Sequence, residues 1–169
     1  MKKHFILLSL ILVCIFANSF KSICVFSIDA SPVTKIDSSY LGSWQIIEDA
    51  EKNYYFTIEK YNNYSFLVSY KSKESVAPIF NKAQSFISIL DSNIFLNIAY
   101  IKGTIKGYTF IKISDINTTK HTMTLSFLKD PTFEFIDNRI SAREMIHANL
   151  NNPNFYEAPL YAKRVDSLK

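Results

Sequence analysis

The sequence predicts an all-β chain with one C-terminal helix, folded as an antiparallel up-and-down β-barrel of about eight strands. Three observations lead to this fold class. The 169-residue chain contains 14 Phe and 10 Tyr and is rich in Ile and Thr, side chains that suit the pleated surface of a strand. Several segments alternate apolar and polar residues with a period of two. Short turns containing Asn or Asp separate these segments, without a helical pattern between them.

Residues 1–19 have the pattern of a signal peptide. A basic start precedes an apolar run over residues 5–17, which is shorter than the roughly 20 residues of a membrane-spanning helix. Small residues at Ala17-Asn18-Ser19 suit a cleavage site, and Val25-Phe26-Ser27 is a second candidate. We therefore expect an exported protein, periplasmic or secreted, without an integral membrane span in its mature form. An uncleaved N-terminal anchor is the alternative.

One domain is expected after the signal peptide. Residues 20–37 are predicted to form an extended leader, and residues 38–169 a single barrel domain. A chain of this size buries about two-thirds of its unfolded surface, which is enough for an independent core. Cys24 is the only cysteine beyond the signal peptide, and one thiol cannot close a disulfide within the chain. The stability of the domain must therefore come from its core.

The first half of the barrel is predicted from alternation around asparagine turns. The first strand covers residues 42–48. Residues 54–59 and 64–70 alternate on either side of Asn62-Asn63, which predicts a hairpin because asparagine tolerates the positive φ of such turns. Residues 72–82 are polar and predict a loop at the mouth of the barrel.

The second half continues as a meander with turns of a few residues. Repeated short connections favour antiparallel neighbours, and closure of the sheet removes edges that invite aggregation. The predicted strands cover residues 85–90, 94–101, 108–114, 121–128 and 132–136.

A helix is predicted near the C-terminus, over residues 141–150. Ser141 and Glu144 have the spacing of a capping box, in which each side chain binds the other's backbone amide. Apolar residues fall on one face, so the helix is expected to lie against the outside of the barrel. Pro153 stops it. Residues 160–165 are strand-like and are expected to pair with the first strand or to cover an edge.

The charge of the chain argues against nucleic-acid binding. The formal net charge is +4, and loss of Lys2 and Lys3 with the signal peptide leaves 17 basic against 15 acidic side chains, a net charge of +2. Nucleic-acid sites gather basic side chains on one face, whereas the lysines here are spread over the whole body, as at Lys71, Lys102 and Lys129. We expect no nucleic-acid partner.

The start of the first strand carries a motif. Ile36-Asp37 is followed by Tyr40-Leu41-Gly42-Ser43-Trp44, which contains the only tryptophan of the chain. In this motif and in the order of its elements the chain resembles the lipocalin family and its lipocalin-like bacterial relatives, the calycins. The Thr-Asp-Tyr type motif of the family has no counterpart here. The alternative is another small antiparallel barrel or sandwich, in which Trp44 is a core residue.

The resemblance implies a structural motif of Gly42, Trp44 and an arginine. The family places an arginine between the last barrel strand and a helix, packed over the tryptophan, and Arg139 occupies that place in the order of elements. Arg164, on the terminal strand-like segment, is the alternative. Such a cation–π contact contributes about 0.5–2 kcal/mol. The expected role is structural, with the indole closing the floor of the barrel.

An eight-stranded barrel encloses either packed side chains or one small ligand. The residues expected to face inward are Tyr54, Phe56, Ile58, Phe66, Val68, Ile98, Phe110, Leu125 and Phe127. Tyrosine hydroxyls available for a polar head are expected at Tyr54, Tyr64, Tyr70, Tyr100 and Tyr108. The candidate ligand-binding residues are Tyr54, Phe56, Phe66, Tyr70, Tyr100, Phe110 and Phe127. The alternative is that these rings form a packed core.

Catalytic and metal-binding patterns are not found in the sequence. His121 and His147 lie beyond the signal peptide without the spacing of a metal site. Glu134 and Asp137 are a possible acid–base pair, but solvated side chains are the simpler interpretation. We expect no enzyme activity, no metal and no cofactor.

Two functions remain for such a chain. The first is an exported lipocalin-like protein that binds a small hydrophobic ligand without catalysis. The alternative is a solid barrel that acts as a protein-interaction module, for example a secreted or envelope inhibitor or a host-directed factor. An internal cavity of about 300 Å³ or more, the usual lower limit for a ligand pocket, separates the two.

Overall fold

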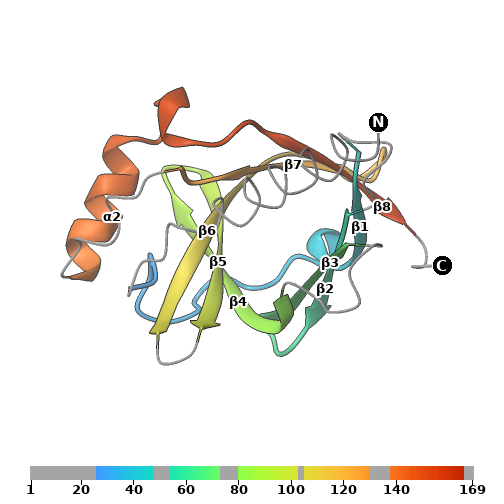
Figure 1. Cartoon of the computed structure of the whole chain (residues 1–169), viewed down its shortest axis with the longest axis horizontal. Coiled ribbons are helices and arrows are strands. Elements are labelled where there is room, and N and C mark those ends of the chain that lie inside the picture. The colour runs from blue at the N-terminus through green and yellow to red at the C-terminus, as the bar shows by residue number, and fades with distance from the viewer. Residues whose placement is uncertain (1–25, 48–53, 73–79, 103–104, 130–137, 166–169) are drawn as a thin grey trace, which may run out of the picture.

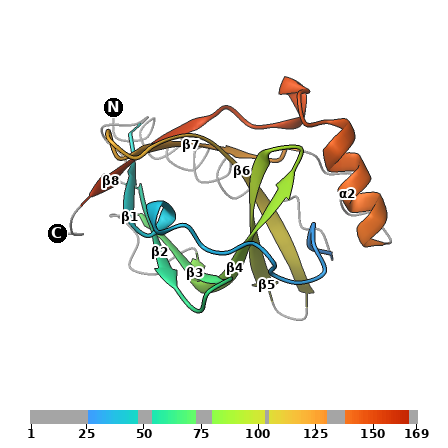
Figure 2. The ribbon, with the colours of Figure 1, turned by 180° about the vertical axis from the view of Figure 1, so that it is seen from behind.

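The computed structural model describes residues 26–47, 54–72, 80–102, 105–129 and 138–165 of the chain. Within them the body is a closed antiparallel barrel, with eight strands neighbouring each other in chain order and one α-helix on the outside (Figures 1 and 2). The predicted fold class is confirmed.

The strands follow each other as an up-and-down meander. Each pairs antiparallel with the next one in the chain. Their bounds are β1 (Gly42–Ile46), β2 (Tyr54–Lys60), β3 (Phe66–Ser72), β4 (Phe80–Leu90), β5 (Asn93–Lys102), β6 (Ile105–Asn117), β7 (Thr122–Phe127) and β8 (Leu160–Val165).

Strand β8 closes the barrel. It pairs with β7 on one side, where Met123 is opposite Ala162, and with β1 on the other, where Trp44 is opposite Arg164. Of the two alternatives expected for residues 160–165, the structure shows pairing with the first strand. The strand predicted at residues 132–136 lies outside the described residues. In chain order, therefore, the strand that completes the barrel comes after the helix.

The turn between β2 and β3 uses asparagine differently from the prediction. Asn62 and Asn63 do not have positive φ; instead the Asn62 Oδ1 atom accepts a hydrogen bond of 2.8 Å from the Tyr64 N–H. Positive φ is found in the turn between β4 and β5, at Asp91 (46°) and Ser92 (66°). This is the pattern of a two-residue hairpin turn of the primed type.

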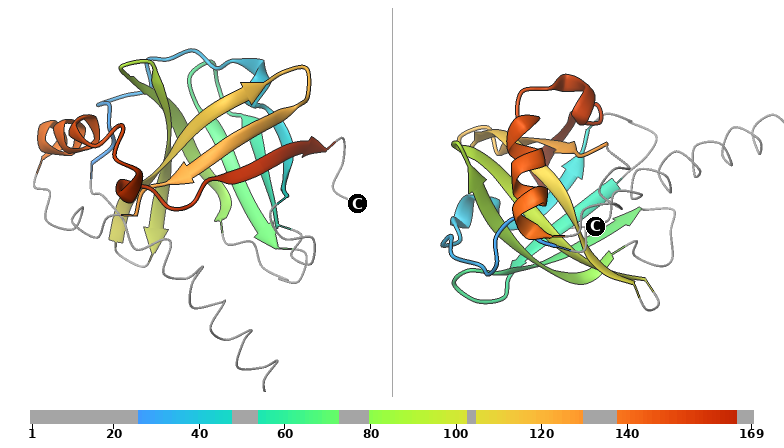
Figure 3. Two further views of the ribbon diagram at one scale, coloured as in Figure 1. Left: turned by 90° about the horizontal axis from the view of Figure 1, so that it is seen from above. Right: turned by 90° about the vertical axis from the view of Figure 1, so that its left-hand side faces the viewer.

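Helix α2 (Arg139–Ala148) lies across the outside of the barrel, as predicted (Figure 3). Its N-cap is Asn138, whose side chain accepts a hydrogen bond of 2.8 Å from the Ser141 N–H. The prediction that Ser141 caps the helix is therefore wrong by one turn. The helix ends before the cap residue Asn149, and Pro153 instead begins a short 3-10 helix, η3 (Pro153–Phe155).

Two separate hydrophobic cores result. The first fills the barrel and includes Trp44, Phe56, Phe66 and Met123. The second lies between the outer face of the barrel and α2, and consists of Ile28, Leu90, Phe95, Phe110, Leu128, Ala142, Ile146, Leu150 and Phe155. Full burial of a side chain of this size contributes about 1.5–3 kcal/mol relative to exposure. The wall formed by β4, β5 and β6 therefore packs apolar side chains on both of its faces.

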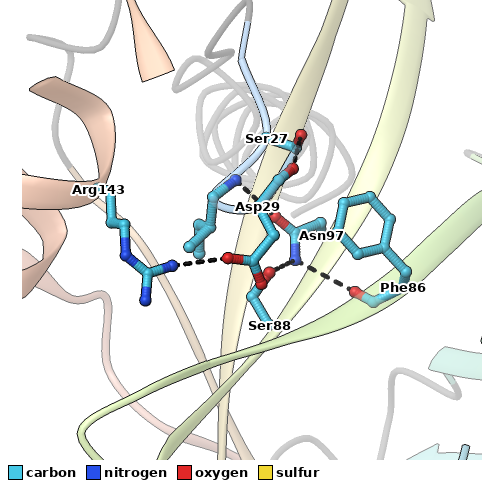
Figure 4. Close-up of polar contacts among 7 residues, drawn as sticks. Ser27, Asp29, Phe86, Ser88, Asn97 and Arg143 are labelled. Carbon is cyan, nitrogen blue, oxygen red and sulfur yellow. Dashed lines mark hydrogen bonds and ion pairs between the residues drawn. The ribbon is translucent and has the colours of Figure 1, made fainter. Parts of the chain in front are cut away.

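The chain before the barrel is fixed to this outer face. The Ile28 N–H donates to the Asn97 Oδ1 atom at 3.0 Å, and the Asn97 Nδ2 group donates to the Phe86 carbonyl at 3.2 Å and to the Ser88 Oγ atom at 2.9 Å (Figure 4). Ile28 is 1 % exposed and Asn97 0 %. An ion pair of 2.6 Å joins Asp29 to Arg143 of α2. The polar groups of this contact satisfy one another away from water.

Two tyrosines, the buried Tyr70 and the partly buried Tyr156, predict a loss of stability at alkaline pH. Burial raises the pKa of Tyr156 to about 12, and burial together with the charge of Tyr54 raises the pKa of Tyr70. A tyrosine whose pKa in the folded state exceeds the unfolded value of about 10 stabilises the fold below that pH and loses this contribution above it. We expect the free energy of unfolding, measured by urea denaturation, to fall as pH rises from about 10 to 12.

A matched pair of variants tests this cause. Tyr156→Phe should give a shallower alkaline decline than the unchanged chain, whereas Tyr61→Phe should leave it as it is because Tyr61 is 59 % exposed. Burial lowers the pKa of Lys112 below its ordinary value of 10.5. This lysine therefore makes the free energy of unfolding rise with pH, and it does so only below pH 10.5. A free energy of unfolding that stays level or rises above pH 10 would contradict the prediction.

Candidate functional site

The interior of the barrel has an aromatic wall on β1, β2 and β3. Trp44 and Phe56 are stacked with ring centroids 6.3 Å apart and planes 10° apart. Tyr54 and Tyr70 are stacked in the same way at 5.9 Å. Stacked pairs of this kind contribute about 0.5–1.5 kcal/mol beyond the burial of their surface. These rings therefore hold one another in place.

The remaining strands contribute an aliphatic wall, and little volume is left between the two. The cavity inside the barrel measures about 30 Å³. Its lining consists of Ile46, Phe56, Ile58, Val68, Tyr70, Leu96, Ile98, Ile111, Ile113, Leu125 and Phe127. Because one water molecule needs about 10–15 Å³ on this measure, the cavity has room for about two. It is about one-tenth of the size at which ligand pockets begin.

Most residues predicted to face inward do so. Phe56, Ile58, Phe66, Val68, Tyr70, Ile98 and Leu125 are buried in the barrel core, with Tyr54 and Phe127 partly buried against it. Phe110 is a wrong prediction, because it lies in the second core under α2. Of the other tyrosines, Tyr64 is exposed on a turn and Tyr108 packs against that second core. The side chain of Tyr100 lies outside the described residues.

Trp44 closes one end of the barrel. Its indole Nε1–H donates to the Tyr40 carbonyl at 3.0 Å, and Tyr40 ends the 3-10 helix η1 (Ser38–Tyr40), which directly precedes β1. The Tyr40 ring in turn meets Phe66 edge to face, with centroids 6.2 Å apart. Trp44 is 2 % exposed. We call this end of the barrel the closed end.

The arginine at the closed end is Arg164. Gly42 has φ +124°, a conformation that side-chain-bearing residues rarely adopt, and a Cβ there would stand 2.9 Å from the Arg164 Nε atom. Arg139, the residue predicted to cover Trp44, instead lies at the start of α2 with its guanidinium carbon 6.0 Å from the centroid of the Phe26 ring. Figure 1 places α2 far from β1 and β8. The placement of Arg139 over Trp44 is therefore wrong.

A depression lies beside Trp44 on the outside of the closed end. It has a volume of about 290 Å³, much larger than the internal cavity. Its lining consists of Asp37, Ser38, Ser39, Trp44, Ile116, Asn117, Thr118, His121 and Arg164. We call this feature the closed-end depression. It combines one acidic side chain, one arginine and several neutral hydrogen-bonding groups around an apolar base.

Composition and motifs did not predict this depression. The order of the strands is the one sequence feature that bears on it. In an up-and-down barrel every second turn lies at the same end, so the turn after Asn117 lies at the end of the barrel where Gly42 begins β1. The Arg164 N–H donates to the His121 carbonyl at 2.9 Å, which fixes this proximity. The closure of the barrel by β8, which sets Arg164 opposite Trp44, thus brings Asp37, His121 and Arg164 together.

No sign of a metal centre is found in the described part of the chain. There, no three His, Cys, Asp or Glu side chains gather in a group able to hold an ion. Glu134 and Asp137, the carboxylate pair considered from the sequence, lie outside the described residues. A search of the described helices also finds none with the length and apolar character needed to cross a bilayer.

Comparisons of the chain with protein-family models, curated proteins and solved structures found no match.

Proposed function

We propose that the protein is an exported, lipocalin-like solid barrel that binds a partner at its surface and does not catalyse a reaction. The observation that carries this proposal is the internal cavity of about 30 Å³. A carrier of small molecules needs roughly 300 Å³ or more. Export is supported by the basic and apolar pattern of residues 1–19.

The lipocalin-like assignment rests on the closed end. Gly42 and Trp44 lie at the start of β1 as the sequence motif predicted, a 3-10 helix precedes them, and Arg164 rather than Arg139 is the arginine beside them. All of these residues stabilise the barrel, and the rings inside it are paired with one another. With its interior used for packing, the barrel is a scaffold, and recognition takes place on its loops and outer surface.

Transport of a small hydrophobic ligand is the second candidate function. It is favoured by the lining of the internal cavity, which consists of aliphatic and aromatic side chains. A ligand larger than a few atoms requires these side chains to move apart, against the packing of Trp44 on Phe56 and of Tyr54 on Tyr70. The small volume therefore ranks this function below surface recognition.

Native mass spectrometry separates the two functions. The protein is purified from its own host under native conditions, and its mass is compared with that of the same sample after denaturation. A solid barrel gives equal masses, and it also fails to enhance the fluorescence of 1-anilinonaphthalene-8-sulfonate. Phe56→Ala serves as a positive control, because removal of a ring 7 % exposed opens the interior and should admit the dye.

A stoichiometric lipid on the unchanged protein would overturn the solid-barrel proposal. In that case Leu96→Phe, which adds volume to the cavity lining, should remove the lipid, whereas Ile140→Phe on α2, where the side chain is 70 % exposed, should not. Surface recognition is supported if the unchanged protein binds neither a lipid nor the dye while the Phe56→Ala variant binds the dye.

A further inference from the structure

The closed-end depression carries two opposite charges that do not neutralise each other. Asp37 and Arg164 both line it, but within the described part of the chain neither takes part in an ion pair. The charged atoms of Asp37 and Arg164 are therefore more than 4.0 Å apart. Two fixed, separated charges of opposite sign on one hollow are complementary to a molecule with the reverse pair.

Each charged residue contacts neighbouring groups of the closed end. The Asp37 Oδ1 atom accepts a hydrogen bond of 2.8 Å from the Ser39 N–H and caps η1. The guanidinium of Arg164 lies against Gly42, and its backbone N–H is bonded to the His121 carbonyl. Both side chains are exposed, and both start from backbone that is hydrogen-bonded or capped at the closed end.

Neutral groups complete the hollow. Asn117 uses its Oδ1 atom to accept a 2.7 Å hydrogen bond from the Lys120 N–H, which leaves its Nδ2 group to donate. His121 has φ +52°, a left-handed conformation that costs energy in a residue with a side chain and is found more often at functional sites. Trp44 and Ile116 give an apolar base. The volume of about 290 Å³ suits a molecule of about ten heavy atoms or fewer.

We propose that the closed-end depression binds a small zwitterion of the α-amino acid class. Arg164 binds its carboxylate, Asp37 binds its ammonium group, and Ile116, next to the buried Trp44, contacts an apolar side chain. Arginine suits this role because its planar guanidinium makes two parallel hydrogen bonds to a carboxylate. This inference goes beyond the proposed function and stands without it, since it concerns a site outside the barrel.

The test titrates the full chain with three matched probes, L-leucine, 4-methylpentanoate and isopentylamine. The second is leucine without the amino group, and the third is leucine without the carboxylate. Trp44, the only tryptophan, lines the site and reports binding through its fluorescence, and calorimetry measures it independently. We expect saturable binding of L-leucine, with the two analogues at least tenfold weaker.

Charge-matched variants locate the binding. Asp37→Asn should reduce the affinity for L-leucine to that for 4-methylpentanoate, and it keeps the cap of η1 because asparagine caps as well as aspartate. Glu144→Gln, an exposed acid on α2, should have no effect. Arg164→Met should abolish binding, whereas Lys163→Met, the same charge loss at the next and exposed residue, should not.

Two results would overturn the proposal. One is equal binding of all three probes, which would indicate that only their shared apolar group is bound. The other is absence of any saturable signal from L-leucine in calorimetry while thermal unfolding shows the protein to be folded. Neither result affects the mass-spectrometric test of the solid barrel, so the two proposals fail separately.

Discussion

Replacement of Trp44 by alanine is expected to lower the free energy of unfolding by about 3–5 kcal/mol, the range for deletion of a buried tryptophan side chain. The indole is 2 % exposed, donates to the Tyr40 carbonyl and stacks on Phe56. Its loss removes all three interactions and leaves a cavity at the closed end. Urea denaturation followed by circular dichroism measures the change, since the chain has no other tryptophan to report it.

Two further variants show whether burial is the cause. Trp44→Phe keeps most of the stacking and should cost clearly less than Trp44→Ala. Ile47→Ala, just beyond β1 and 52 % exposed, should change stability by no more than about 0.5 kcal/mol. A loss below about 1.5 kcal/mol for Trp44→Ala would show that the closed end does not depend on the indole.

Replacement of Asn97 by alanine is expected to cost about 2–4 kcal/mol, because it leaves buried hydrogen-bonding groups without their partner. The Ile28 N–H loses its acceptor, and the Phe86 carbonyl and Ser88 hydroxyl lose a donor (Figure 4). Calorimetric unfolding measures the loss of stability. Limited proteolysis should also show faster cleavage near residue 28, because Asn97 fixes this segment to the barrel.

An exposed asparagine provides the control. Asn151→Ala, in the turn after α2, removes the same side chain where water replaces its hydrogen bonds. It should leave both stability and the cleavage pattern nearly unchanged. If Asn97→Ala behaves like Asn151→Ala, the segment around Ile28 is held by apolar contacts alone and the buried polar network contributes nothing measurable.

The inward residues of β2 and β3 followed from the sequence, whereas Phe110 of β6 did not. Phe56 and Ile58 alternate with polar neighbours, because the outer face of β2 is free of the helix and meets water. Phe110 and Ile111 are adjacent and both buried, since the wall of β4, β5 and β6 packs on the barrel core and on α2. A strand covered on both faces loses its alternation, so sequence cannot tell which of its side chains point inward.

The choice between two arginines and between two helix caps was equally open in the sequence. Arg139 and Arg164 both come after the strands that the sequence predicted up to residue 136. Asn138 and Ser141 are both residue types that suit an N-cap. Contacts distant in the sequence decided each case. Pairing of β8 with β1 sets Arg164 beside Trp44, and the contact with Phe26 holds Arg139 at the other side of the molecule.

The sequence by itself determined an antiparallel meander closed into a barrel, the buried Trp44 at one end and a helix outside. These features depend on local periodicity, turn residues and the single Gly-x-Trp motif. Each of these patterns is formed by residues that are close to one another in the sequence. Only the tertiary structure decided that β8 completes the barrel, that its interior has about 30 Å³ of free space, and that Asp37 and Arg164 share the closed-end depression. Such features depend on how side chains from separate strands fill a common volume. That packing cannot be read from residues that are neighbours in the sequence.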